Sequence, residues 1–182
     1  MTKTELWQFK ADGSGGGSWS VVTPANPSLA SDLLPGEFGA YTTVKDTGFV
    51  IGGVASGWTQ LQRARTQTIP GMLTFNMKSK IWENGTLSAG FSPFETLSAA
   101  SAEYAPVFGP NGLVVILGGW SPSVVGEPDI QSSPVYDLKN ITFMDPQTKK
   151  RHWQEATGDI PPSPRMRFCS VGFQTTNRGY DM

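Results

Sequence analysis

The hydrophobic residues of this chain fall into short runs that are separated by clusters of Gly, Pro, Asn and Ser. The two most apolar runs are residues 49–53 (FVIGG) and 113–119 (LVVILGG), and both end in a pair of glycines. Similar runs rich in β-branched and aromatic residues recur along the chain, whereas the spacing typical of an amphipathic helix is hard to find. This pattern predicts an all-β protein built from short strands and turns.

The apolar runs repeat at a nearly fixed interval. Gly53 and Gly119 are 66 positions apart, and so are two short segments that precede the runs, 37–40 (EFGA) and 103–106 (EYAP). A third segment of this kind, 167–170 (RFCS), follows 64 positions further on. A fixed period that contains several strands is the signature of a repeat architecture, in which neighbouring units bury each other's apolar faces.

Each repeat is expected to contain four strands, which we name a to d in chain order. Strand b is apolar on both faces, so it is expected to lie between neighbouring sheets. In the second repeat Asn111-Gly112 is expected to join a to b, and 145–148 (DPQT) to join c to d. The expected strands are 38–44, 49–53, 72–77 and 80–83 in the first repeat, and 104–108, 113–119, 141–144 and 151–156 in the second.

The glycine pair and the hairpin between strands c and d together resemble the kelch repeat of β-propellers. In that repeat the glycine pair is followed by an aromatic-Asp-Pro-x-Thr-x-x-Trp hairpin. Residues 144–151 (MDPQTKKR) are similar to it, with Met144 in place of the aromatic residue and Arg151 in place of the tryptophan. Residues 75–82 (FNMKSKIW) keep both aromatic residues but lack Asp-Pro. Three segments, 143–146 (FMDP), 157–161 (TGDIP) and 164–169 (PRMRFC), especially resemble kelch-repeat cell-surface proteins of filamentous fungi.

This resemblance implies a kelch-type β-propeller fragment with about two complete four-stranded blades and a partial blade at each end. Propellers typically have four to eight blades, so we expect the chain to be a piece of a larger propeller. Alone, it is expected to expose sheet edges and apolar blade faces, and therefore to aggregate or to fold only in part. The expected units are a c–d hairpin of a first blade at 1–22, a second blade at 36–86, a third at 102–157 and the start of a fourth at 164–182.

The resemblance also gives the glycines and tryptophans a structural role. Paired glycines at the end of strand b would let the backbones of adjacent blades approach closely. Trp19, Trp82 and Trp153 are expected on strands c and d, where they would fill the space between blades rather than serve as ligand platforms.

Composition narrows the functional classes. A net charge of −1 argues against binding to nucleic acid, and no apolar stretch is long enough for a transmembrane helix. The single cysteine excludes an internal disulfide framework and a multi-cysteine metal site. We expect neither a metal nor a cofactor.

Single residues offer little support for catalysis. A copper radical oxidase of the galactose-oxidase type shares the propeller but needs two histidines, and this chain has one, His152, which we expect to be a solvated hairpin residue. Cys169 aligns with Gly39 and Ala105, so we expect a structural role for it rather than that of a nucleophile.

A pair of carboxylates is the remaining catalytic possibility. Glu37 and Glu103 are expected at equivalent positions of strand a, with Arg167 at the third such position. Two acids of this kind can hydrolyse glycosides, but we favour ion pairs that tie adjacent blades together. We therefore predict that the protein is not an enzyme.

The long connections between strands b and c are the expected binding surface. In a propeller the b–c and d–a loops emerge on one face, and loops that mix aromatic and charged residues are typical of binding. A protein or glycan ligand is expected there, although the loops could also merely cover the blades. The candidate residues are Trp58, Arg63 and Arg65 on the first connection, and Trp120, Glu127 and Asp129 on the second.

Two glycosylation sequons begin at Asn84 and Asn140 and favour an extracellular parent protein. The function expected from the sequence is thus that of a non-enzymatic binding or scaffold module, belonging to a propeller that is secreted or held at a cell-surface membrane. Two alternatives remain open: a glycan-directed propeller, either lectin-like or a glycoside hydrolase, and a cytoplasmic kelch adaptor that binds protein partners.

Overall fold

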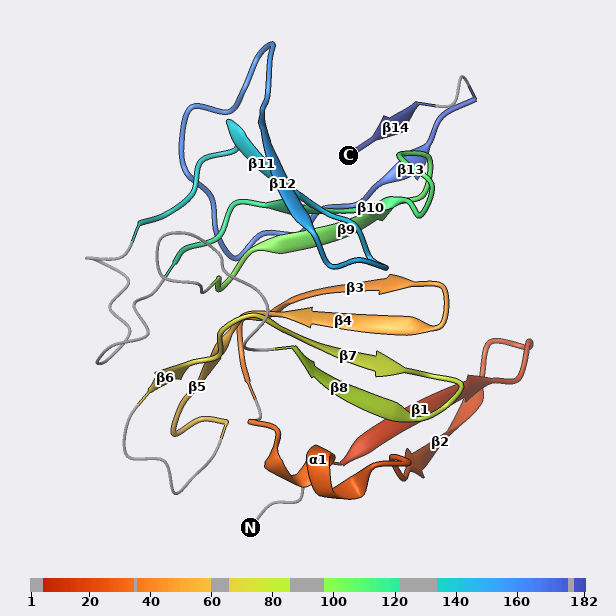
Figure 1. The fold of residues 1–182 in the computed structure, drawn as a ribbon. Helices are drawn as coiled ribbons and strands as arrows, with labels where there is room; N and C mark the ends of the chain where they lie inside the picture. Colours follow the sequence, from red (N-terminus) through yellow and green to blue (C-terminus); the bar gives the residue numbers. More distant parts are fainter. Residues whose placement is uncertain (1–4, 35, 60–65, 86–96, 122–133, 177–178) are drawn as a thin grey trace.

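Two four-stranded antiparallel sheets form the body of the protein. The computed structural model describes residues 5–34, 36–59, 66–85, 97–121, 134–176 and 179–182. In the first sheet the strands are β3 (Ala40–Val44), β4 (Thr47–Ile51), β7 (Met72–Asn76) and β8 (Ile81–Gly85), hydrogen-bonded in that order. In the second they are β9 (Ser101–Ala105), β10 (Leu113–Leu117), β11 (Asn140–Met144) and β12 (Arg151–Glu155), again in chain order. The two sheets are stacked face to face, with β3 beside β9 (Figure 1).

Smaller elements flank this body. They are the hairpins β1 (Leu6–Ala11) with β2 (Gly17–Val22), β5 (Val54–Ala55) with β6 (Gln67–Thr68), and β13 (Phe173–Gln174) with β14 (Tyr180–Asp181), together with one helical turn, α1 (Pro27–Asp32). The prediction of an all-β protein is confirmed, whereas α1 was not predicted. In the described part of the chain no helix is both long and apolar enough to cross a membrane.

The expected strands are present, but strand a of the second repeat is displaced. It was expected at 104–108, whereas β9 ends at Ala105. The reason is the connection that follows it: residues 106–112 join β9 to β10, while only Lys45 and Asp46 join β3 to β4. The longer connection shifts the whole first strand. The starts of β3 and β9 are therefore 61 residues apart, whereas the glycine pairs are 66 residues apart. Asn111-Gly112 is accordingly the end of a longer loop and not a two-residue hairpin.

The main core lies between the two sheets. Phe49 and Ile51 of β4 point into it, while Val50 between them faces the opposite side of the first sheet. Met144 of β11 is fully buried there, and burying a side chain of this size stabilises the fold by about 1.5–3 kcal/mol. The buried members of this core are Ala40, Val44, Phe49, Ile51, Met72, Leu97, Ala100, Ala102, Val114, Ile116 and Met144.

The glycine pairs connect one unit to the next through backbone hydrogen bonds. The amide of Gly53 donates to the carbonyl of Leu97 over 2.7 Å, and the amide of Gly119 donates in the same way to Arg165. A Cβ on Gly52 would collide with the carbonyl group of Leu97. The close approach that was expected of these glycines is thus confirmed, and it holds each sheet against the segment that follows.

A substitution at Gly52 tests this contact, with Gly109 as the matched control. Both residues have a similar positive φ, +64° and +67°, but a Cβ on Gly109 would meet nothing within 4 Å. We expect Gly109→Ala to lower the free energy of unfolding by about 1–2 kcal/mol through backbone strain alone. Gly52→Ala should cost about 1–3 kcal/mol more because of the clash. Equal losses in urea unfolding would contradict this account.

The turns between strands c and d are built on one side chain each. The carboxamide oxygen of Asn76 accepts the amides of Lys78 and Ser79, and a carboxylate oxygen of Asp145 accepts those of Gln147 and Thr148. This is the Asx turn, in which a side chain replaces a backbone acceptor. The tight turn expected at 145–148 is confirmed.

The Asp145 turn should make stability depend on pH. Hydrogen bonds from the amide of Thr148 and the carboxamide of Asn111 hold the pKa of Asp145 below its ordinary value of 3.8. A carboxyl with a lowered folded-state pKa stabilises the fold above its unfolded pKa, and that contribution is lost as pH falls through the folded pKa. We expect wild type to be more stable than Asp145→Asn at about pH 6 and this advantage to shrink below about pH 4. Thermal unfolding of both proteins across this range measures it, and an unchanged difference would rule the interpretation out.

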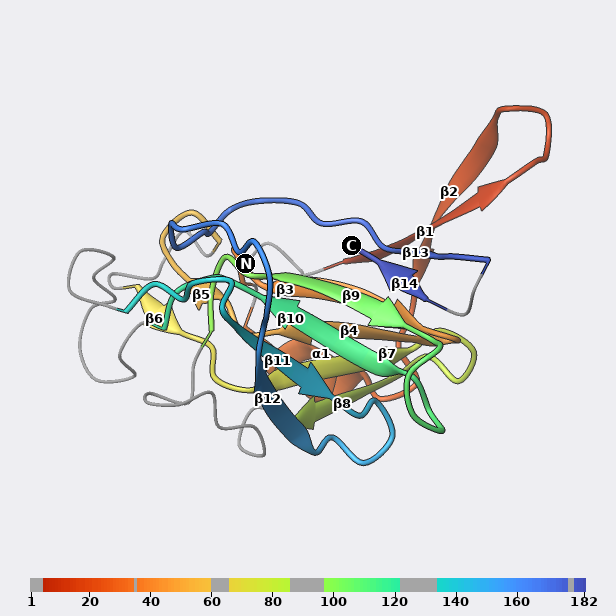
Figure 2. The ribbon, with the colours of Figure 1, turned by 90° about the horizontal axis from the view of Figure 1, so that it is seen from above.

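The two ends of the chain carry a hairpin each. The hairpin expected near the N-terminus is present as β1–β2, which projects from the sheets in Figure 2. The strand expected from 167–170 is not formed: this segment runs along β9 without strand pairing, and β13 begins at Phe173. Tyr180 begins β14, which pairs with β13.

The outer edge of the first sheet is covered by the segment before α1. The carboxamide of Asn26 donates to the carbonyl of Trp82 over 2.8 Å and accepts the amide of the same residue over 3.0 Å. The amide of Ala25 also donates to the carbonyl of Lys80. These bonds satisfy backbone groups of Trp82 on β8 and of Lys80 just before this strand.

Candidate functional site

The described parts of the connections between strands b and c lie at one end of both sheets, and the tight turns lie at the other (Figure 2). The β5–β6 pair belongs to the first of these connections. At the opposite end are the turn between β7 and β8 and the loop between β9 and β10. The sequence-based division of the molecule into a loop end and a turn end is therefore correct.

Trp58 stands at the tip of a hydrogen-bonded turn at the loop end. Its side chain is 94% exposed. Its amide donates to the hydroxyl of Ser56, and the Ser56 and Thr59 residues bond to each other through both backbone and side-chain groups. The backbone under this indole is thus well fixed, although the indole itself is in solvent.

A carboxylate lies beneath the same turn. The hydroxyl of Ser56 donates to a carboxylate oxygen of Glu37 over 2.5 Å. Ser56 is buried, and Glu37 is half-buried just before β3, where its backbone bonds to Val54 in both directions. Glu37, Ser56 and Trp58 therefore form one connected group, in which an acidic side chain and hydroxyls support an exposed aromatic ring.

Trp120, the corresponding candidate on the second connection, is not available to a ligand. It is only 5% exposed, and its backbone bonds to Ser98 in both directions. This position corresponds to Val54, the first residue after the glycine pair of the first sheet, and not to an exposed loop. The assignment of Trp120 to the binding face is wrong. Arg63, Arg65, Glu127 and Asp129, the remaining candidates on the loops, lie outside the described residues.

Glu37, Glu103 and Arg167 were predicted to occupy equivalent positions, but the structure places them at different ones. Because the first strand is shifted by the long β9–β10 loop, Ser98 takes the place of Glu37, and Glu103 lies in the middle of β9. The Glu103 carboxylate accepts the hydroxyl of Ser170, while the guanidinium of Arg167 lies 4.6 Å from the ring centre of Phe38. No ion pair joins any two of Glu37, Glu103 and Arg167, so the predicted links between adjacent units are wrong.

His152 and Cys169 have different outcomes. His152 is exposed on β12 opposite Phe143, as expected of a solvated hairpin residue. Cys169 is exposed as well, so it does not fill a tight position. The amide of Arg167 donates to the carbonyl of Ala99, which aligns these two segments. Counted from this pair, Cys169 corresponds to Ser101 and not to Ala105 or Gly39.

The three tryptophans expected between units are not alike. Trp82 is half-buried and pairs with Phe75 across β7 and β8, with ring centres 4.8 Å apart. Trp153 is 72% exposed and Trp19 is also exposed. Trp82 lines the cleft between the first sheet and the N-terminal segment, and Trp153 lies on the same face of its sheet as Met144 and Ile116 but remains mostly in solvent, so the prediction that these indoles fill the space between units is not confirmed.

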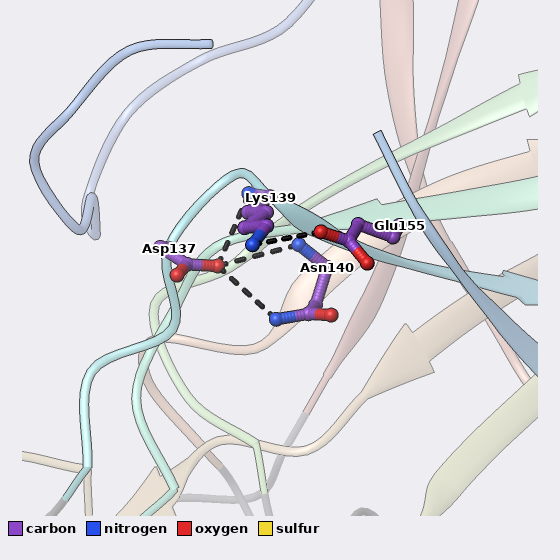
Figure 3. A network of polar contacts seen from close by, with 4 residues as sticks. All are labelled: Asp137, Lys139, Asn140 and Glu155. Carbon is purple, nitrogen blue, oxygen red and sulfur yellow. Dashed lines mark hydrogen bonds and ion pairs between the residues drawn. The ribbon is translucent and has the colours of Figure 1, made fainter. Parts of the chain in front are cut away.

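Both predicted glycosylation residues are exposed on strands of their sheets. Asn84 lies on β8 and Asn140 begins β11. Asn140 also belongs to a small polar network: its amide and its carboxamide both donate to Asp137, and the neighbouring Lys139 forms an ion pair of 2.7 Å with Glu155 (Figure 3). Exposure is compatible with modification of either residue, which stays a prediction.

One feature of the turn end was missed in the sequence. The ammonium group of Lys149 lies 4.2 Å from the ring centre of Phe49 and donates to the carbonyl of Pro146. It lines a shallow cleft of about 380 Å³ between the two sheets, and desolvation lowers the pKa of this lysine. The signal could have been its place after the Asx turn, where Lys80 has the same left-handed backbone. A cation–π contact explains this lysine fully without a ligand.

The contrast between the two loop tryptophans gives a stability test. Trp120→Ala removes a buried indole and should lower the free energy of unfolding by about 3–5 kcal/mol. Trp58→Ala removes an exposed one and should change it by less than about 0.5 kcal/mol. Chemical denaturation of both variants measures the difference, and similar losses would show that the burial described for Trp120 is wrong.

Comparison with known proteins supports the fold only. No protein-family model and no curated protein matches the sequence. Among solved structures, the chain is similar to one described as "Structure of YjhT", with a TM-score of 0.53 and 15% sequence identity. The match covers 90% of this chain and 46% of the other, so the chain spans about half the length of that protein. At this level of identity the likeness identifies a shared all-β fold and leaves the ligand open.

Proposed function

We propose that this chain is a kelch-like part of a β-propeller and that it acts by binding rather than by catalysis. Two observations favour a propeller. Each sheet is a four-stranded meander. The pair of backbone hydrogen bonds that ties the first sheet to the second also recurs between the second sheet and the C-terminal segment. The likeness to YjhT adds weak support for a propeller-type fold. The sheets would be its blades, and further blades would cover the faces that are exposed here.

The exposed indole of Trp58 is the observation that carries the binding function. A tryptophan in solvent costs free energy, since its large apolar surface remains hydrated. Its turn is nonetheless fixed by Ser56 and Thr59, so the ring is presented on a defined backbone. Aromatic residues of this kind are typical centres of protein interfaces, and we place a protein ligand first.

A glycan is the second candidate, and a specific arrangement favours it. The backbone amide of Trp58 donates to the hydroxyl of Ser56, which in turn donates to the carboxylate of Glu37. An apolar platform beside a few hydrogen-bonding groups is the general composition of a small-ligand site, and it matches the apolar faces and hydroxyls of a sugar. Hydrolysis is not part of this proposal, because Glu37 and Glu103 belong to separate hydrogen-bond pairs with Ser56 and Ser170.

The placement of the protein at a cell surface belongs to the same proposal. It rests on the exposed residues Asn84 and Asn140 with their sequons. A cytoplasmic adaptor would carry no glycan at either residue, so mass spectrometry of the protein from its native source separates the two locations.

The binding function is tested with Trp58→Ala, and Trp153→Ala serves as a matched control. Both tryptophans are largely exposed, but Trp153 lies in the middle of β12 and not on a connection between strands b and c. We expect the wild-type chain to bind members of a panel of immobilised oligosaccharides or purified extracellular proteins. Trp58→Ala should weaken that binding at least tenfold, about 1.4 kcal/mol, while Trp153→Ala leaves it unchanged. Equal affinity of wild type and Trp58→Ala would remove the site.

A further inference from the structure

Four connections between strands meet at the turn end of the molecule. Each four-stranded sheet is a meander, so its first and third connections emerge at one end and its second connection at the other. Residues from all four, or directly beside them, line the shallow cleft of about 380 Å³ that opens between the sheets. The four connections, which we call the turn surface, are residues 45–46, 77–80, 106–112 and 145–150.

Charge is distributed unevenly between the turn surface and the rest of the chain. The turn surface carries five of the 14 lysine and arginine residues but only two of the 15 acidic residues. Its net charge is therefore +3, which leaves −4 for the remainder of the chain. All five cationic residues are lysines, namely Lys45, Lys78, Lys80, Lys149 and Lys150.

The two acids of the turn surface are already held by groups of the turns themselves. Asp46 forms an ion pair of 2.7 Å with Lys78. Asp145 accepts the backbone amides that close its Asx turn, together with the carboxamide of Asn111. Neither carboxylate is therefore available to the exposed lysines of this surface.

Three of the lysines have no acidic partner among the residues that the structure describes. Lys45 and Lys150 are exposed, and no ion pair involves either of them. Lys80 donates to an uncharged group, the carboxamide oxygen of Gln8, over 3.4 Å. Their ammonium groups can therefore bind an anion without the loss of an existing ion pair.

Lys149 contributes charge to the turn surface but no free contact. Its ammonium group lies over the ring of Phe49 and donates to the carbonyl of Pro146. Glu83 on β8 and Asp145 also act on it electrostatically, although neither forms an ion pair with it. Contacts to a ligand thus fall to the other three lysines.

The backbone of the turn surface is strained where it carries lysine. Lys45, Lys80 and Lys149 have φ between 53° and 61°, in the left-handed region. Glycine adopts this conformation without a steric cost, whereas the Cβ of lysine approaches the following carbonyl oxygen. Lysine nevertheless occupies every left-handed position of the turn surface that is not glycine. Backbone strain of this kind clusters at functional sites, and the property that these three side chains share is a cationic end.

The lysines lie close enough together to act on one ligand. Neighbouring strands are about 4.8 Å apart and stacked sheets about 10 Å apart. The turns of the two sheets are therefore separated by about one Debye length at physiological ionic strength. At such distances the potentials of several ammonium groups add and attract an extended polyanion.

We propose that the turn surface binds a polyanionic polysaccharide, with Lys45, Lys80 and Lys150 as the contacts to its sulfate or carboxylate groups. A protein partner fits less well, because lysine is depleted in protein interfaces while arginine is enriched, and the turn surface has no arginine. A lipid partner is disfavoured by the cell-surface location proposed above, because the anionic leaflet of a membrane faces the cytoplasm. The inference rests on that location for the choice of ligand, and not on binding at Trp58.

Binding of the chain to immobilised dextran sulfate and carboxymethyl dextran tests the proposal, with uncharged dextran as the control. We expect binding to at least one charged polymer, the tighter one identifying the preferred anion, and none to dextran. For a polymer as highly charged as DNA, three lysine contacts should weaken binding roughly 40-fold between about 50 and 200 mM salt. No binding to either charged polymer, or binding that salt does not weaken, would overturn the proposal.

Two double variants with equal loss of charge locate the surface. Lys45→Gln with Lys150→Gln should weaken binding about tenfold. Lys139→Gln with Arg165→Gln is the matched control, because both residues are exposed but lie outside the turn surface, and it should bind like wild type. Equal losses in the two variants would show attraction by net charge alone and would overturn the site. Tighter binding to phosphatidylserine vesicles than to either polymer would overturn the choice of a polysaccharide.

Lys45→Gly separates binding from support of the fold. It removes one ammonium group and relieves the left-handed strain at the same position. We expect binding about twofold to fivefold weaker, with a midpoint of thermal unfolding no lower than that of wild type. A lower midpoint, or unchanged binding, would show that Lys45 serves the turn and not a ligand. Because these assays need no ligand of Trp58, failure at the loop end and failure at the turn surface are scored separately.

Discussion

The close approach of the backbone at the end of each central strand is the constraint on which the fold depends. At Gly53 and Gly119 the chain leaves a sheet and donates its amide to the first residues of the following unit. Because this contact is between main chains, it requires residues without a Cβ and places no demand on the rest of the sequence. Units that differ greatly in side chains and loop length can therefore be stacked in the same way.

The same constraint explains which parts of the fold could be predicted from sequence. The glycine pair and the apolar run before it mark β4 and β10 without ambiguity, and the Asx turn marks the hairpin that follows. The first strand has no such local marker. Matching Glu37 with Glu103 by sequence similarity ignored the longer loop 106–112, and this shifted the second repeat by five residues. The bridges from Glu37 to Val54 and from Ser98 to Trp120 define the register, and they are long-range contacts that sequence spacing does not reveal.

The candidate site shows the corresponding limit for function. Trp58 and Trp120 have similar sequence surroundings, since each follows an apolar run with its glycine pair. Trp120 follows the pair directly, where it is buried and bridged to Ser98 and Val135, whereas Trp58 is five residues beyond Gly53 and has reached solvent. The difference between a core residue and a ligand platform is thus a matter of a few positions along one connection. Residue type alone could not decide it, but the distance from the glycine pair could have.

The carboxamide of Asn26 has a consequence for how copies of this protein can meet. By occupying both backbone groups of Trp82, it removes from the middle of the row two of the hydrogen-bonding groups through which an edge strand recruits other chains. Sideways growth of the first sheet into a continuous intermolecular β-structure is therefore blocked at this strand. A single amide side chain, placed just before a helical turn, thereby protects this edge from the strand pairing that leads to fibres.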